Sequence, residues 1–232
     1  MPSVNPPVLS QKLPDHLRYI AIEGVIGAGK TTLASYLADR FNGRLVLEAF
    51  DENPFLPRFY EDRSRWGFHT QLNFLASRFH QQKNLQNRDL FQQVVFSDYV
   101  FDKDRIFAHM NLEGDELQLY ESLYGIMEQS VPLPDLVVYL QSTTERLLHN
   151  ISIRGRVYEQ GIDPQYIAGL HEAYNRYFLH YNKSPLLIVN ATKLDFVRNA
   201  DHLEQLINTI VKHRYGGTEF FNPAIEQIDL NF

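Results

Sequence analysis

A glycine-rich segment carries the residues of this sequence that are best suited to chemistry: Gly24-Val25-Ile26-Gly27-Ala28-Gly29-Lys30-Thr31. Its spacing is typical of a phosphate-binding loop, whose glycines let successive backbone N–H groups point at phosphate oxygens. Lys30 can reach the β- and γ-phosphates, and Thr31, followed by Thr32, can offer a hydroxyl to Mg²⁺. An apolar run precedes the loop and a helical segment follows it, so the helix dipole would also attract phosphate. The segment predicts a nucleoside triphosphate site; the alternative is a glycine-rich turn with a chance lysine.

Two carboxylates follow predicted strands, at the edge of a parallel sheet where ligands bind. Glu48 ends the strand expected over Arg44–Glu48, and a carboxylate beside the γ-phosphate could accept the proton of an attacking hydroxyl. Asp98 ends the strand expected over Gln93–Asp98, where phosphate-loop proteins often keep a carboxylate for Mg²⁺. The alternatives are an ordinary surface glutamate or helix cap at 48, and an aspartate that starts a turn at 98.

An arginine pair, Arg154-Gly155-Arg156, lies just before Glu159-Gln160-Gly161. Guanidinium groups stabilise charge on a phosphoryl group in transfer, and closure of a basic flap excludes water. The segment therefore indicates a small arginine-containing lid, although a solvated turn after a helix has the same composition.

Four polar or aromatic residues stand between the second and third predicted strands: Tyr60, Trp66, Gln71 and Arg78. The two aromatic residues could pack against a ring. Gln71 and Arg78 are seven positions apart, so on a helix they share a face. A side-chain amide donates and accepts at once, which suits a nucleobase. The alternative is an amphipathic helix with two polar residues on its outer side.

The composition limits the classes of partner. The chain has 232 residues and a net charge of −6, so a polynucleotide partner is disfavoured. There is no cysteine, and no apolar run approaches the ~18 residues of a membrane span. The nine histidines show no metal-ligand spacing, and the N-terminus lacks the pattern of a secretory signal. We expect a soluble cytoplasmic protein without a membrane or nucleic-acid partner.

Apolar strand-like runs alternate with helical ones, which predicts a doubly wound α/β fold of the phosphate-loop (P-loop) NTPase type. Five parallel strands flanked by helices are expected over Tyr19–Glu23, Arg44–Glu48, Gln93–Asp98, Leu136–Leu140 and Leu186–Val189. Helices are expected over Thr32–Phe41, Phe68–Leu85, Glu116–Gln129, Thr143–Ile153, Pro164–His180 and Ala200–Lys212. The predicted organisation is a loose tail (1–17), one domain (18–213) and a C-terminal extension (214–232), docked through Phe220, Phe221 and Ile225.

Three helix starts carry capping signals. Ser142-Thr143-Thr144-Glu145 predicts a capping box. Asp163, before Pro164, and Asn199 are expected to cap the last two helices.

Together these segments resemble the deoxynucleoside kinase family over about residues 18–212. The resemblance implies a base at Glu48 and phosphate contacts from Arg154 and Arg156. It implies that Tyr60 and Glu159 hold the sugar 3′-hydroxyl and that Gln71 faces the nucleobase. Leu194-Asp195-Phe196 is similar to the loop that packs on the adenine of ATP.

The sequence departs from that family at the end of the third strand. The family commonly has Glu-Arg-Ser there, and the matching residues are Ser97-Asp98-Tyr99, so Asp98 would supply the metal carboxylate and the 5′-side arginine is absent. Many members carry an aspartate a few residues later that works with the helix arginine on the base, and Lys103 stands at that position. The Asp98-Tyr99 pair and the segment Glu52–Phe55 resemble the bacterial deoxyguanosine/deoxyadenosine kinase branch, which favours purine substrates.

The resemblance implies Mg²⁺- and ATP-dependent phosphorylation of a deoxynucleoside 5′-hydroxyl, in nucleotide salvage, by a homodimer. A nucleoside monophosphate kinase is an alternative; it would need basic residues for the acceptor's phosphate, for which Arg63 and Arg65 are candidates. A catalytically silent structural relative would have lost the lysine, the base or the lid arginines, and all are present. A phosphate-loop switch protein would lack a pocket for a second substrate.

Overall fold

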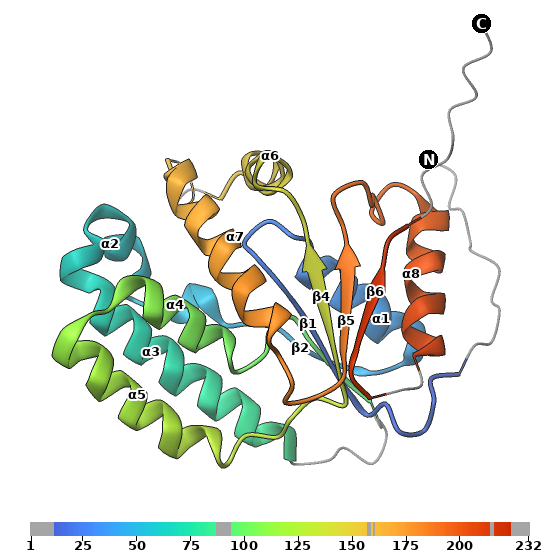
Figure 1. The fold of residues 1–232 in the computed structure, drawn as a ribbon, viewed down its shortest axis with the longest axis horizontal. Coiled ribbons are helices and arrows are strands. Elements are labelled where there is room, and N and C mark those ends of the chain that lie inside the picture. Colours follow the sequence, from blue (N-terminus) through green and yellow to red (C-terminus); the bar gives the residue numbers. More distant parts are fainter. Residues whose placement is uncertain (1–11, 87–93, 157–158, 160, 214–215, 224–232) are drawn as a thin grey trace, which may run out of the picture.

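Six parallel strands form the central sheet, in the order β2-β3-β1-β4-β5-β6 (Figure 1). The computed structural model describes residues 12–86, 94–156, 159, 161–213 and 216–223. The strands are β1 (Tyr19–Gly24), β2 (Arg44–Val46), β3 (Val95–Ser97), β4 (Leu136–Gln141), β5 (Leu186–Asn190) and β6 (Thr218–Phe221). The predicted α/β class with a parallel sheet is confirmed, with one strand more than predicted.

The central strands are buried on both faces. All six residues of β1 and the first five of β4 are buried, as their unbroken apolar runs predict for a parallel sheet. The two strands beside the site are shorter than predicted, since β2 ends at Val46 and β3 at Ser97. Glu48 and Asp98 therefore lie in the loops beyond the strands, where their side chains can turn toward a ligand.

The sixth strand lies in the predicted C-terminal extension. β6 pairs with β5 in parallel, and its residues alternate between exposed and half-buried. Phe221 packs against the core, whereas Phe220 is 66% exposed and does not dock as predicted. Ile225 lies outside the described residues. Four residues after a glycine pair offered too short a pattern to predict a strand.

The helices are α1 (Lys30–Phe41), α2 (Leu56–Glu61), α3 (Arg63–Lys83), α4 (Lys103–Asn111), α5 (Gly114–Glu128), α6 (Thr144–Arg154), α7 (Pro164–Leu179) and α8 (Ala200–Lys212), with short 3₁₀ turns at Phe50–Glu52 and Asn84–Gln86. All six predicted helices are present. The sequence missed α2 and α4. The first is one and a half turns long with a proline in its first turn, and the second buries charged residues in its own first turn.

Two of the three predicted caps are confirmed. The Asp163 side chain accepts from the amide of Gln165, and the Asn199 side chain accepts from the amides of Asp201 and His202. The capping box placed at Ser142 is wrong by one residue, because Thr143 is the cap and accepts from the amide of Arg146.

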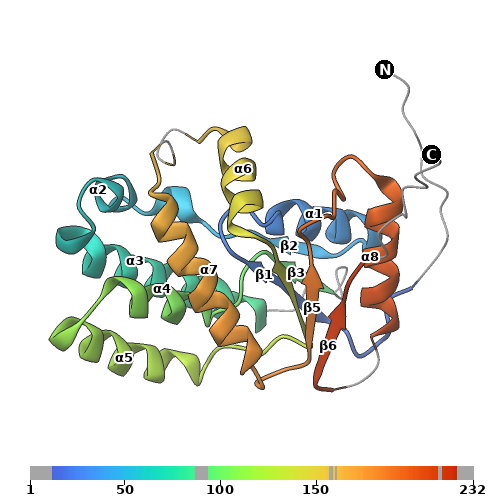
Figure 2. The same ribbon diagram turned by 45° about the horizontal axis from the view of Figure 1, so that its top comes forward.

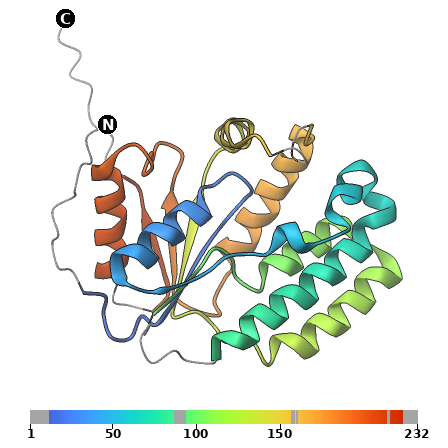
Figure 3. The ribbon, with the colours of Figure 1, turned by 180° about the vertical axis from the view of Figure 1, so that it is seen from behind.

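The sheet is covered on both faces, and a helical layer stands at one side of it. Helix α1 packs against β1 and β3 on the face seen in Figure 3, and α7 lies on the other face. Helices α3, α4 and α5 pack together at one side of the sheet (Figures 1 and 2) around a second hydrophobic cluster that includes Leu75, Tyr120 and Tyr124. Residues of α3 and α4 line a common pocket with the loops after β2 and β3.

Candidate active site

The phosphate loop joins β1 to α1 in the predicted strand–loop–helix setting. Gly27 and Gly29 have positive φ angles of 87° and 92°. A Cβ atom at Gly27 would lie 2.7 Å from the carbonyl oxygen of Leu147, and one at Gly29 would lie 2.8 Å from the Phe196 ring. Glycine is therefore required at both positions by backbone conformation and by space.

Lys30 folds back over this loop. Its Nζ donates to the carbonyl oxygens of Gly24 (2.8 Å) and Val25 (3.2 Å). Burial, and then the charge of Lys103, lower the pKa of the Lys30 ammonium to about 8, against the attraction of nearby carboxylates. Because Lys30 Nζ contacts carbonyl oxygens, a triphosphate beside it would add negative charge in direct contact.

A cleft of about 480 Å³ opens beside the loop, and we call it the donor cleft. It is bordered by the loop, α6 and the segment after β5; its predicted site residues are Gly27, Ala28, Gly29, Lys30, Thr31, Thr32, Arg154, Arg156, Asp195 and Phe196. Of the other predicted loop residues, Ile26 faces the neighbouring pocket, and Gly24 and Val25 form the inner bend under Lys30. The structure thus brings the two segments predicted for ATP, far apart in sequence, to one cleft.

Asp98 joins the loops that follow β1 and β2. Its Oδ2 accepts from the Thr31 hydroxyl at 2.6 Å, and its Oδ1 accepts from the Glu48 amide at 2.8 Å. Hydroxyl and carboxylate oxygens are ligands that Mg²⁺ accepts, and in phosphate-transfer sites one or two such ligands suffice beside the phosphates. The residues present at Thr31 and Asp98 therefore fit the metal that the fold implies.

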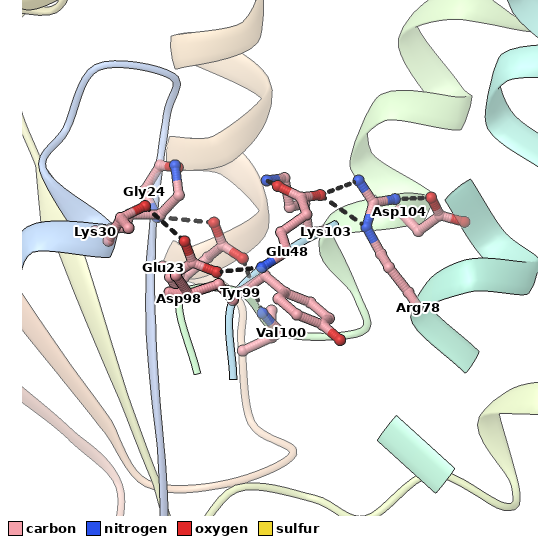
Figure 4. A network of polar contacts seen from close by, with 12 residues as sticks. Glu23, Gly24, Lys30, Glu48, Arg78, Asp98, Tyr99, Val100, Lys103 and Asp104 are labelled. Atoms are coloured by element: carbon pink, nitrogen blue, oxygen red, sulfur yellow. Dashed lines mark hydrogen bonds and ion pairs between the residues drawn. The ribbon is translucent and has the colours of Figure 1, made fainter. Parts of the chain in front are cut away.

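Glu48 lies between two cations (Figure 4). Its Oε1 accepts from Arg78 Nε (3.0 Å) and Nη2 (2.5 Å), and its Oε2 accepts from Lys103 Nζ (2.5 Å). Burial alone would raise the pKa of the Glu48 carboxyl, but Lys103 and Arg78 outweigh burial and hold it well below its usual range. Glu48 is therefore an ionised acceptor, oriented on both oxygens.

Arg78 also pairs with a carboxylate that the sequence analysis missed. Its Nη1 contacts Asp104, which is fully buried and accepts from the Tyr120 hydroxyl at 2.8 Å. An aspartate that pairs with the helix arginine is thus present at position 104, one residue beyond Lys103, although it does not itself line the pocket described next. It was missed because α4 was not predicted, so the direction of its first-turn side chains was unknown.

A second, narrower pocket of about 100 Å³ adjoins the donor cleft, and we call it the acceptor pocket. Its apolar wall is made by Leu56, Phe59, Phe74, Phe107 and Tyr166. All seven predicted substrate residues line it: Glu48, Tyr60, Gln71, Arg78, Asp98, Lys103 and Glu159. The Gln71 Oε1 and Thr70 Oγ1 atoms are buried and have no hydrogen-bond partner among the residues that the structure describes. Such orphaned atoms are costly unless a ligand satisfies them, which is what a binding pocket requires.

Trp66 does not line either cavity. Its ring stacks on Phe55 with centroids 6.0 Å apart. The interpretation of Trp66 as a ring-packing site residue is therefore not supported, while Tyr60 does reach the acceptor pocket.

The lid arginines are paired with the lid glutamate. Arg154 contacts Glu159 through Nε (3.1 Å) and Nη2 (2.5 Å), and Arg156 Nη1 lies 3.6 Å from the same carboxylate. The Arg156 guanidinium also lies 4.0 Å from the centroid of the Phe50 ring. Both arginines border the donor cleft and the acceptor pocket, so they stand at the junction of the two cavities. Gln160 lies outside the described residues.

Comparison with known proteins decides the family. A family model described as "Deoxynucleoside kinase" matches residues 20–214. This chain belongs to the deoxynucleoside kinase family. It is 33% identical over 193 residues to the deoxyguanosine kinase of Bacillus subtilis (strain 168), covering 81% of this chain and 93% of that protein. It is 31% identical over 198 residues to the deoxyadenosine/deoxycytidine kinase of the same organism, covering 82% and 90%.

Solved structures agree. The deoxyadenosine kinase from M. mycoides with bound dATP superposes with a TM-score of 0.73 at 25% identity, covering 83% of this chain and 98% of that one. The same enzyme with dCMP and dCDP gives a TM-score of 0.72 at 27% identity, covering 83% and 98%. The chain is thus a phosphotransferase of the deoxynucleoside kinase type. Within its described part, no helix combines the length and apolar character needed to cross a bilayer.

This deoxynucleoside kinase also carries a buried carboxylate under its phosphate loop that the sequence analysis did not single out. Glu23 is fully buried in β1 and accepts from the amides of Gly24 and Val100, each at 2.9 Å. Burial raises the pKa of Glu23, although Lys103 and Lys30 oppose the rise. Glu23 fixes the start of the phosphate loop to the segment after β3. The sequence feature that could have pointed to Glu23 is a single charged residue within an otherwise apolar strand.

Proposed function

We propose that this kinase transfers the γ-phosphoryl group of ATP to the 5′-hydroxyl of a purine deoxynucleoside. One observation carries the proposal: Glu48 lines the acceptor pocket together with Lys30 and Thr31 of the phosphate loop. A hydroxyl seated against Glu48 would therefore point toward the end of a triphosphate held in the donor cleft. That is the arrangement that in-line phosphoryl transfer needs.

The proposed step gives each group a role. Glu48 accepts the proton of the 5′-hydroxyl as that oxygen forms its bond to phosphorus. Lys30 and the loop amides hold the phosphates, and Arg154 and Arg156 turn from Glu159 to the charge on the moving group. Thr31 and Asp98 would hold Mg²⁺, which when bound supplies positive charge to the phosphate oxygens.

The polar groups of the acceptor pocket support a nucleoside as acceptor. The unpartnered Oε1 atom of Gln71 can accept from a nucleobase amino or ring N–H group. Tyr60 and Glu159 are proposed to hold the sugar 3′-hydroxyl, because both line the same pocket. The purine preference rests on the resemblance and on relatives named deoxyguanosine and deoxyadenosine kinase.

The monophosphate kinase alternative gains no support from the two arginines it needs. The Arg63 guanidinium lies 3.9 Å from the centroid of the Tyr166 ring, and that of Arg65 lies 5.4 Å from the centroid of the Trp66 ring. Neither arginine lines the acceptor pocket.

A phosphorylation assay tests the proposal, with ATP against the four deoxynucleosides, their ribo-analogues and the monophosphates. We expect turnover of deoxyadenosine or deoxyguanosine above that of the pyrimidines and little use of monophosphates. Preferred use of a monophosphate would overturn it. The homodimer, the cytoplasmic location and the salvage role are part of the same proposal; light scattering of the purified protein tests the dimer.

A further inference from the structure

A buried ammonium group lies beside the proposed base. Lys103 opens α4, its side chain is 6% exposed, and its Nζ lies 2.5 Å from Glu48 Oε2. Figure 4 shows Lys103 and Arg78 on opposite sides of the Glu48 carboxylate, with the ammonium of Lys103 on the side toward Lys30. Lys103 therefore stands at the phosphoryl end of the acceptor pocket, whereas Asp104, its neighbour in α4, meets Arg78 at the other end.

The two cations that contact Glu48 differ in whether a second carboxylate pairs with them. Arg78 has a second carboxylate, Asp104, which is fully buried. For Lys103, Glu48 is the carboxylate within ion-pair distance among the described residues. When Glu48 takes the hydroxyl proton it becomes neutral, and Arg78 keeps Asp104 while Lys103 loses its partner. A buried ammonium that has lost its contacting carboxylate is costly, even with the buried Glu23 in its surroundings, so it favours new negative charge in contact with it.

No arginine comes from the end of the third strand to meet that charge. Tyr99, which follows Asp98, is fully buried, and its hydroxyl donates to Gln81 Oε1 at 2.8 Å. Arg154 and Arg156 belong to the lid and are paired with Glu159. Outside the lid, the cations that line the acceptor pocket are Lys30, Lys103 and Arg78, and Arg78 is held by Asp104. Lys30 and Lys103 lie close enough for Lys103 to lower the pKa of Lys30.

We propose that Lys103 is a second catalytic lysine, whose ammonium contacts the phosphoryl group during its transfer beside Glu48. This inference rests on the proposed function and deepens it. In the step, the bond from the 5′-oxygen to the γ-phosphorus forms and the bond from that phosphorus to the ADP oxygen breaks. The hydroxyl proton moves to Glu48, and Lys103 keeps all of its protons and turns from Glu48 to the phosphoryl oxygens.

Three variants separate charge from packing: Lys103→Met, Lys103→Gln, which keeps a donor for Glu48 without the charge, and Lys103→Arg. We expect kcat for the deoxynucleoside to fall on the order of 10²-fold in the Met and Gln variants, the scale of one lost preorganised stabiliser. KM for the deoxynucleoside should stay within about threefold, and the Arg variant should recover part of kcat. Lys212→Met removes an exposed lysine at the end of α8 and should change neither constant.

A binding measurement gives a second readout that needs no turnover. ADP, Mg²⁺, aluminium fluoride and the deoxynucleoside together mimic the phosphoryl group in transfer. In a Glu48→Gln background, Lys103→Met should still weaken this complex about tenfold or more, as expected for a charge that touches the phosphoryl mimic itself. ADP binding, which checks that the variants are folded, should stay unchanged.

The outcomes are distinct. If the wild type is active and Lys103→Gln keeps a near-normal kcat, Lys103 contributes only a hydrogen bond to Glu48. That result overturns its catalytic role. Loss of the Lys103→Met effect in the Glu48→Gln background does the same, because Lys103 would then act only through Glu48. A wild type that phosphorylates no deoxynucleoside overturns the proposed function, and the role of Lys103 falls with it.

Discussion

At the scale of single residues, the site holds Glu48, the proposed base, in a form that binds protons weakly. Lys103 and Arg78 keep Glu48 ionised, which suits a reaction whose transition state is loose and whose hydroxyl loses its proton late. Such a base acts mainly by orienting the hydroxyl, so its geometry matters more than its proton affinity. The two cations fix that geometry at the cost of basicity.

Glu48→Gln tests this role. The amide keeps the size of the side chain but cannot take the proton, so kcat should fall by roughly 10²–10⁴-fold while KM for the deoxynucleoside changes little. Steady-state kinetics measure both constants. Glu52→Gln, at an exposed glutamate in the same loop, is the control and should match the wild type. A change in KM alone would make Glu48 a binding group.

The lowered pKa of Lys30 predicts that the protein takes up protons when ATP binds. Its pKa is lowered to about 8 in the free protein, and a polyphosphate beside it would raise that pKa. Above pH 8 the free protein has lost part of this proton, so ATP binding should take up a fraction of a proton per site. Calorimetry at pH 8.5 in buffers of different ionisation enthalpy measures it. Equal uptake by Lys30→Met would assign the proton to another group.

At the scale of elements, Asp98 joins three strand ends, since it follows β3 and accepts from the loops after β1 and β2. Asp98→Asn should raise the Mg²⁺ concentration needed for half-maximal rate, because a neutral amide is a poorer ligand for a hard cation. A Mg²⁺ titration of the initial rate measures this. An unchanged Mg²⁺ requirement with an altered nucleoside preference would instead place Asp98 on the substrate.

The lid and α2 are predicted to meet at the sugar. Tyr60→Phe and Glu159→Gln should each reduce discrimination against 2′,3′-dideoxynucleosides, because a site built for a hydroxyl leaves polar groups unpaired without it. The two effects should be non-additive, since both side chains share one partner. The kcat/KM ratio of deoxy- to dideoxynucleoside in both singles and the double measures this. Strictly additive losses, or equal use of both substrates by the wild type, would reject the shared contact.

At the scale of the whole molecule, the parts of the fold that could be predicted are those with a repeating pattern. Buried apolar runs predicted β1, β4 and β5, and helical periodicity with capping residues predicted α7 and α8. The remainder depends on contacts that no local pattern records. α4 begins with two buried charged residues whose burial is compensated by Glu48, Arg78 and the Tyr120 hydroxyl. The ion pairs among Glu48, Arg78, Lys103 and Asp104 likewise join α3, α4 and the loop after β2, so spacing could not reveal them.

The acceptor pocket is supported from behind by the second hydrophobic cluster. Tyr120, a fully buried member of that cluster in α5, donates to Asp104, and Asp104 holds Arg78 at the pocket wall. The helical layer therefore reaches the site through a chain of hydrogen bonds. Removing the Tyr120 hydroxyl in α5 should therefore disturb the position of Arg78 in the pocket, although Tyr120 does not line the pocket itself.

Tyr120→Phe should cost about 1–3 kcal/mol of unfolding free energy, because one oxygen of a buried carboxylate loses its donor. It should also raise KM for the deoxynucleoside more than KM for ATP, since Arg78 lines the acceptor pocket and not the donor cleft. Tyr124→Phe is the matched control: the same residue type in the same helix and cluster, with its hydroxyl on Asp102 at 3.1 Å. It should lose stability without a selective change in KM. Urea unfolding measures the stability of both variants, and steady-state kinetics measure their KM values. Equal shifts of the deoxynucleoside KM in the two variants would mean that the cluster affects the pocket only through general stability. Asp104 would then not couple Tyr120 to Arg78.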